Sequence, residues 1–142
     1  MSVLPLPSFR PERIHPILVN FTASLLPASF ISDVFGRISR RQSLHTAAWW
    51  MLLYATAITP LTIFAGLWWK ASLGSGLPAS TIRIHQWLGI SLGFLFVVLT
   101  GWRGRTYSRA TAPGFPYLLL AMVVVAALIY QGRIGGELAF GP

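Results

Sequence analysis

The chain has 142 residues, of which 54% are hydrophobic and only 10% are charged, and its formal net charge is +8. Soluble domains carry about a quarter charged residues, so this composition, with a mean hydropathy of +0.63, indicates a membrane protein. The absence of cysteine excludes disulfides, thiolate metal sites, iron–sulfur clusters and covalently attached c-type haem.

Four apolar segments predict four transmembrane helices, because about 20 helical residues cross the hydrocarbon core of a bilayer. They cover residues 16–35, 45–69, 82–102 and 115–134. Their connections, at 36–44, 70–81 and 103–114, are short, which favours antiparallel neighbours. We therefore expect one all-α domain over residues 1–142, an integral membrane four-helix bundle with up-down-up-down topology.

The first segment carries a stripe of small and polar residues at every fourth position: Asn20, Ser24, Ala28 and Ser32. Such a stripe is typical of a helix that packs closely against another helix in a membrane. Asp33 and Arg37 stand four residues apart at the end of the same segment, and this spacing predicts an ion pair on the helix surface.

The second segment begins and ends with paired tryptophans, which are Trp49, Trp50, Trp68 and Trp69. Their spacing is that of the two membrane interfaces, where tryptophan is enriched. In the connection that follows, Ser80 and Thr81 are candidate N-caps for the third helix.

The third segment places His85, Gly89 and Gly93 on one helical stripe, each four residues after the last. A Gly-x-x-x-Gly spacing most often marks close contact between two helices. Glycines on the same helix face as a histidine also leave room for a flat cofactor beside the helix. The fourth segment has no polar side chain between Tyr117 and Tyr130. The interior thus lacks the ionisable groups of an ion or solute pathway, and we predict no small-molecule substrate.

Basic residues set the expected orientation. Six arginines lie in the connections 36–44 and 103–114, and five basic residues lie at the other ends of the segments. This difference predicts that both termini face the periplasm. Because the arginines sit at the ends of the spans, we expect the lipid bilayer and its headgroups as partners and no nucleic acid.

Three motifs resemble those of a bacterial family of four-helix membrane proteins, domain of unknown function 2231. The first segment opens with His15-Pro16-Ile17-Leu18-Val19, similar to the family's His-Pro-x-x-Val motif. Arg83-Ile84-His85 is similar to its third-helix histidine, and residues 132–138 to its terminal Gly-x-x-Gly-Gly-x-Leu signature. The resemblance spans about residues 13–141 and implies a multi-pass protein of the bacterial inner membrane.

The chain departs from the family pattern at several positions. Asn20 stands where the family usually has a second histidine, and Thr22 where it has proline. Ala139 and Phe140 replace a Val-Tyr pair. If that second histidine serves as a ligand in relatives, this chain has lost it.

Topology brings His15, His85 and a glycine-rich turn at Gly135 and Gly136 to one face of the bundle, with Glu137 beside the turn. His45 lies at the opposite face. The first functional hypothesis is one b-type haem held by His15 and His85, with Gly89 and Gly93 giving room beside the macrocycle, in a small electron-transfer protein. In this prediction His15 lies at the helix cap.

Two further hypotheses stay open. One is a divalent metal site formed by His15, His85 and Glu137, whose side chains are suitable ligands. The other, which the sequence favours over haem and metal, is a membrane anchor or accessory subunit of a larger, possibly redox, assembly, in which the histidines cap helices or contact headgroups. The three acids of the chain are spread over both faces and no nucleophile–base pair is present, so we expect no enzyme activity from this chain alone.

Overall fold

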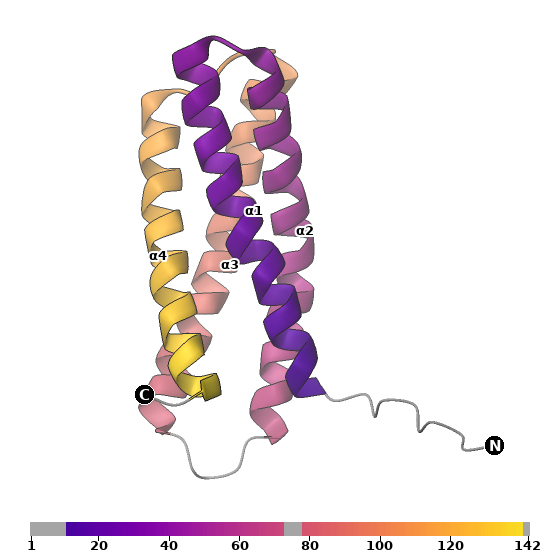
Figure 1. The fold of residues 1–142 in the computed structure, drawn as a ribbon, viewed down its shortest axis with the longest axis vertical. Coiled ribbons are helices and arrows are strands. Elements are labelled where there is room, and N and C mark those ends of the chain that lie inside the picture. The colour runs from indigo at the N-terminus through magenta and orange to yellow at the C-terminus, as the bar shows by residue number, and fades with distance from the viewer. Residues whose placement is uncertain (1–10, 73–77, 141–142) are drawn as a thin grey trace, which may run out of the picture.

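The computed structural model describes residues 11–72 and 78–140 and consists of four long helices (Figure 1). Their bounds are α1 Pro11–Ser39, α2 Gln42–Ser72, α3 Ala79–Ser108 and α4 Phe115–Phe140. All four are long and apolar enough to cross a membrane. The prediction of an all-α four-helix membrane domain is confirmed.

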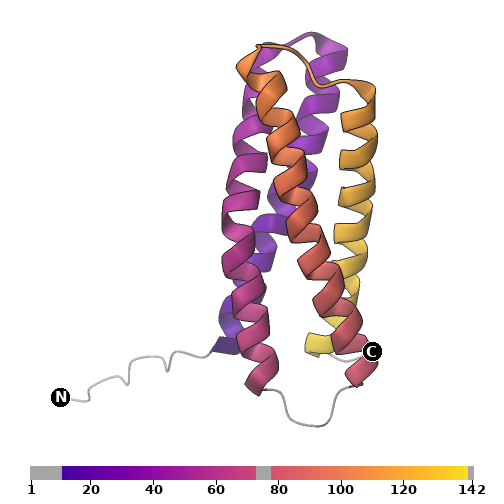
Figure 2. The ribbon, with the colours of Figure 1, turned by 180° about the vertical axis from the view of Figure 1, so that it is seen from behind.

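The helices run up, down, up and down, as Figures 1 and 2 show from opposite sides. Contacts join α1 to α2, α2 to α3, α3 to α4 and α1 to α4, which closes the bundle. We call the end where α1 begins and α4 ends the terminal end. The other end, where the α1–α2 and α3–α4 connections lie, we call the hairpin end. His15 and Asp33 are 18 residues apart on α1, so about 27 Å, close to the thickness of a bilayer core, separates the two ends.

Several helices extend beyond the predicted spans. α1 begins at Pro11, so His15 lies in its second turn and not at a cap. α3 continues through Arg103 to Ser108, and α4 continues through Gly135 and Gly136, where we predicted a turn. The reason is tertiary: Arg103 finds a buried partner, and Gly135 lies under a histidine ring, so both stretches gain contacts by staying helical.

The start of α3 also differs from the prediction. Its N-cap is Pro78, which makes no side-chain capping bond, and Ser80 and Thr81 lie inside the helix. The connection between α1 and α2 shrinks to Arg40 and Arg41, and Arg40 adopts a positive φ of 56° to make the tight turn.

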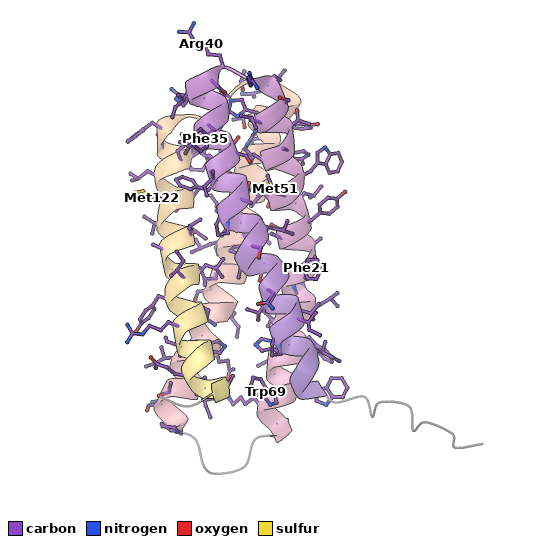
Figure 3. The ribbon with its side chains drawn as sticks, in the orientation of Figure 1. Phe21, Phe35, Arg40, Met51, Trp69 and Met122 are labelled. Atoms are coloured by element: carbon purple, nitrogen blue, oxygen red, sulfur yellow. The ribbon has the colours of Figure 1, made fainter. Side chains whose placement is uncertain are left out.

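The core lies between the four helices and is built from Leu26, Leu52, Leu92, Phe96, Leu99, Tyr117, Val124 and their neighbours. Large apolar side chains also cover the outside of the bundle, among them Phe21, Phe35 and Met122 (Figure 3). A surface of this kind suits contact with lipid chains.

The buried face of α1 is not the one that its small residues predicted. Asn20 and Ser24 are exposed, whereas Thr22, Ser29 and Asp33 are buried. The Ser29 hydroxyl donates to the Ala48 carbonyl of α2 at 2.7 Å. The buried stripe turns away from the predicted one because the polar partners on α2 and α3 select its orientation.

Candidate functional site

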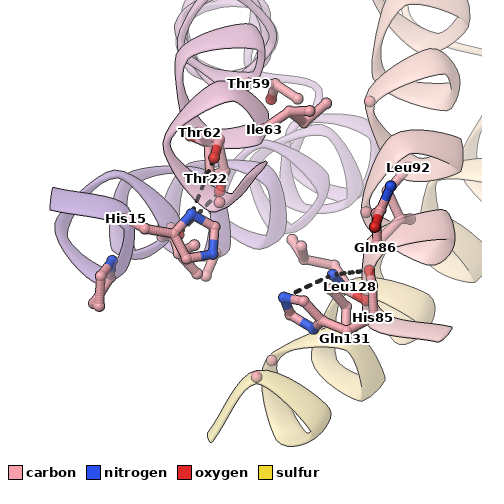
Figure 4. A pocket seen from close by; sticks show the side chains of 18 of the residues that line it. His15, Thr22, Thr59, Thr62, Ile63, His85, Gln86, Leu92, Leu128 and Gln131 are labelled. Carbon is pink, nitrogen blue, oxygen red and sulfur yellow. Dashed lines mark hydrogen bonds between the residues drawn. The ribbon is translucent and has the colours of Figure 1, made fainter. Parts of the chain in front are cut away.

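A cavity of about 300 Å³ opens at the terminal end and is lined by residues of all four helices. His15 reaches it from α1 and His85 from α3, and the two imidazoles point toward one another across it (Figure 4). The structure therefore brings together the two histidines that sequence analysis placed at one face.

His15 is held from one side by α2. Its Nδ1 lies 3.0 Å from the Thr62 carbonyl oxygen, which can only accept, so Nδ1 carries the proton and donates. The ring lies against Gly66, where an added Cβ would come within 2.8 Å of the histidine Cε1. Trp69 packs beside it with ring centroids 5.9 Å apart. Nε2 keeps its lone pair, as in a histidine that binds a metal.

His85 is held by α4. The Gln131 side-chain amide donates to the backbone carbonyl of His85 at 2.8 Å, and its nitrogen lies 3.4 Å from His85 Nε2. The imidazole rests on Gly135, where a Cβ would lie 3.0 Å from Cε1. Two buried atoms, His85 Nδ1 and Gln131 Oε1, have no hydrogen-bond partner within the described residues. The terminal end thus holds polar groups that the described chain leaves unsatisfied.

The two imidazoles have a defined mutual geometry. Their centroids are 6.4 Å apart and their planes are nearly perpendicular, at 86°. Two imidazoles that bind one metal ion from opposite sides have centroids roughly 6 Å apart, since each metal–nitrogen bond is about 2.0–2.1 Å. The measured separation matches this value.

Gly89 and Gly93 of α3 line the cavity and also accommodate neighbouring side chains. At Gly89 an added Cβ would meet the Gln131 amide at 2.9 Å, and at Gly93 it would meet Ile63 of α2 at 2.8 Å. Gly93 therefore serves close helix packing, the more common meaning of its motif. Gly89 allows Gln131 to reach His85.

Glu137 does not join the two histidines. Its carboxylate accepts from Arg133 at 3.2 Å on the exposed surface of α4. Across residues 11–72 and 78–140, no group of three His, Cys, Asp or Glu side chains could hold a metal ion. The proposed set of His15, His85 and Glu137 is thus not assembled, because helical continuation of α4 turns Glu137 outward.

The hairpin end contains a second polar cluster, which sequence analysis missed. Asp33 is fully buried and accepts from His45 Nδ1 at 2.8 Å. Arg103 donates to the same carboxylate through Nε and Nη2, each at 2.9 Å, and to the His45 carbonyl at 2.8 Å. The carboxylate, imidazole and guanidinium come from three helices and satisfy one another.

This cluster replaces the predicted ion pair between Asp33 and Arg37. Arg37 is exposed and donates to the Pro113 carbonyl at 3.1 Å. Asp33 points inward, where the Arg103 guanidinium supplies its counter-charge through two hydrogen bonds. As predicted, His45 lies at the opposite end from His15 and His85.

All three histidines share one packing device. Each ring lies against a glycine of a neighbouring helix: His15 on Gly66, His85 on Gly135 and His45 on Gly36, where a Cβ would come within 3.0 Å of the ring. None of these three contacts was predicted from the sequence, which placed Gly135 near the histidines but as part of a turn.

These features define a four-helix integral membrane protein with a histidine-lined cavity at one end and a buried ionic cluster at the other. The model of a family described as a predicted membrane protein (DUF2231) matches residues 11–141. The chain therefore belongs to this family, as its motifs suggested. No curated protein and no solved structure matches it significantly.

Proposed function

We propose that the protein binds one b-type haem between His15 and His85. The observation that carries this proposal is the pair of imidazoles facing each other across the cavity with centroids 6.4 Å apart. The Nδ1–H bond of His15 to Thr62 leaves Nε2 as the ligating atom. Bundle cores commonly hold cofactors between side chains of facing helices.

The surroundings of the two histidines also suit this group. The cavity lies between helices that present mainly apolar side chains, and about 300 Å³ falls within the range of small-molecule sites. Lys70 lines the cavity and would hold an acidic substituent of the macrocycle there. A haem with two imidazole ligands supplies one-electron transfer, so the role would be electron transfer within the membrane.

An absorption spectrum tests this proposal. Protein purified from haem-supplied cells should show a Soret band, and dithionite should sharpen the visible bands as expected for two imidazole ligands. His15→Ala and His85→Ala should each lose or shift these bands. His45→Asn, which removes an imidazole at the other end and retains a donor for Asp33, should keep them. A folded protein without a Soret band would overturn the proposal.

Elemental analysis of the same sample addresses the competing metal proposal. A divalent ion bound to haem-free protein, and lost in His85→Ala, would favour a metal held by His15 and His85 with ligands other than Glu137. Metal content that is unchanged in His85→Ala would contradict it.

We further propose that the protein is an accessory or anchor subunit of a larger redox assembly. Ser24 exposes its hydroxyl inside the α1 span, where lipid does not satisfy it, whereas the exposed Asn20 also lines the cavity of His15 and His85. Such positions are usually covered by another helix that accepts hydrogen bonds. Gentle detergent extraction should co-purify a partner, and Ser24→Leu, which lies outside the cavity, should release it. Retention by that variant would place the contact elsewhere.

We propose the bacterial inner membrane as location, with the terminal end in the periplasm. The arginines of the hairpin end support this orientation through the positive-inside rule. Two exposed serines allow a matched test, since Ser80 lies at the terminal end and Ser108 at the hairpin end. A membrane-impermeant thiol reagent added to intact spheroplasts should label Ser80→Cys and spare Ser108→Cys. The reverse pattern would invert the orientation.

A further inference from the structure

A second pocket lies at the hairpin end, far from the cavity of His15 and His85. It has a volume of about 390 Å³ and is lined by Gly36, Arg37, Arg40, Gln42, His45 and Ala112. Arg40 projects beyond the helix ends, at the tip of the bundle (Figure 3). In a membrane this tip lies at the level of the lipid headgroups.

The pocket is positively charged without a compensating acid. The chain has three acids, and Glu12 and Glu137 lie near the start of α1 and the end of α4, both at the terminal end. The third, Asp33, is fully engaged by Arg103 and His45. The charges of Arg37 and Arg40 therefore remain available to an anion.

The start of α2 favours an anion at this place. His45 lines the pocket, but its Nδ1 proton is donated to Asp33 and its Nε2 carries a lone pair, so it offers no donor to an anion. Gln42 begins α2, whose first turn contains no acidic residue, so the positive end of the helix dipole also faces this region.

We propose that this pocket binds the phosphate group of an anionic phospholipid headgroup. Arginine guanidinium groups match phosphate oxygens in geometry and charge, and the Gln42 side-chain amide adds a neutral donor. Basic pockets between transmembrane helices are known sites for acidic headgroups. The acyl chains of the lipid would lie along the apolar outside of the bundle. This inference is independent of haem binding.

Native mass spectrometry of the detergent-solubilised protein can test the pocket. With added phosphatidylglycerol, the wild-type protein should retain one lipid at concentrations about tenfold lower than with phosphatidylcholine. The variant Arg37→Gln/Arg40→Gln should bind phosphatidylglycerol at least about tenfold more weakly, since it loses charge-assisted hydrogen bonds. Arg105→Gln/Arg109→Gln has the same charge change at the same end outside the pocket, and it should bind within about twofold of the wild type.

Three results would overturn the proposal. Equal losses in the two double variants would show that charge alone attracts lipid, and equal binding of the two lipids would show no acidic selectivity. Displacement of the lipid by millimolar inorganic phosphate, with the same dependence on Arg37 and Arg40, would assign the pocket to free phosphate. Because Arg37 also contacts Pro113, Arg40→Gln alone repeats the measurement with that contact intact, and its melting temperature should equal that of the wild type.

Discussion

The two ends of this bundle use the same kind of residue in opposite ways. At the hairpin end, the His45 imidazole bonds a fully buried carboxylate, which a bidentate guanidinium also engages. At the terminal end, His15 and His85 face each other across a cavity, and His85 Nδ1 is buried without a partner from the described residues. A satisfied polar cluster fastens helices together, whereas an unsatisfied one marks a place where another group can bind.

The hairpin end and the terminal end should therefore differ in stability as well as in their hydrogen bonds. Unpaired buried polar atoms lower the free energy of unfolding, so an end that retains them is less stable than it need be. We therefore expect the hairpin end to supply most of the unfolding free energy and the terminal end to tolerate substitution.

The largest effect is expected for Asp33→Ala. Removing the carboxylate leaves Arg103 buried with no counter-charge, and breaking a buried pair in this way costs about 3–5 kcal/mol of unfolding free energy. Titration of the detergent-solubilised protein with SDS, followed by circular dichroism, measures this loss. Arg105→Gln changes an exposed charge two residues further along α3 and should leave the transition midpoint unchanged. A similar midpoint for both variants would refute the idea that this cluster fastens the helices.

The second-largest loss of unfolding free energy is expected at one of two glycines that contact histidine rings. Gly36→Ala presses a Cβ against His45, which Asp33 holds in place, so overpacking should cost about 1–3 kcal/mol. Gly135→Ala presses on His85, whose ring can turn into the cavity, and we expect less than half that cost. At Gly132 a Cβ meets nothing within 4 Å, so Gly132→Ala should be neutral or stabilising. SDS unfolding of the three variants gives the order, and equal costs at positions 36 and 135 would show that both ends are equally rigid.

A smaller effect is expected for Ser29→Ala. The variant loses the hydrogen bond to the Ala48 carbonyl, and such bonds between membrane helices contribute about 0.6 kcal/mol on average. Ser24→Ala, on the exposed side of the same helix, provides the control in the same unfolding titration. A greater loss of unfolding free energy for Ser24→Ala than for Ser29→Ala would mean that α1 is rotated about its axis and buries a different face.

The smallest effect is expected for Gln131→Met. This variant removes a 2.8 Å bond to the His85 carbonyl and also an unsatisfied buried oxygen, and the two terms nearly cancel. The change in unfolding free energy should stay below about 0.5 kcal/mol in haem-free protein. A loss of 2 kcal/mol or more, about the cost of an unsatisfied buried group, would contradict the adaptable character of the terminal end.

The fold follows from the sequence because apolar length and turn spacing depend only on local composition. The same holds for the meeting of His15 with His85, since antiparallel topology alone places two segment starts at one face. The cluster at the hairpin end depends instead on the rotation of three helices about their axes. Asp33 was assigned to its sequence neighbour Arg37, and Arg103 to a loop, because local spacing does not encode contacts between residues 70 positions apart.

The glycine contacts were hidden for a related reason. A glycine inside an apolar segment gives no indication of its neighbours. Which side chain packs against it becomes clear only when the position of the facing helix is known. Gly66 and Gly36 therefore carried no recognisable signal, whereas Gly135 was noticed within a terminal motif and was misread as part of a turn.

The three histidine–glycine contacts also make a statement about other members of the family. Positions 15 and 66, 36 and 45, and 85 and 135 each share one volume, so the size of one side chain limits the size of the other. In an alignment of relatives, these positions should change in pairs, with a larger residue at the glycine position accompanied by a smaller one opposite. Such covariation would show which of the two helices in each relative provides the larger side chain at each contact.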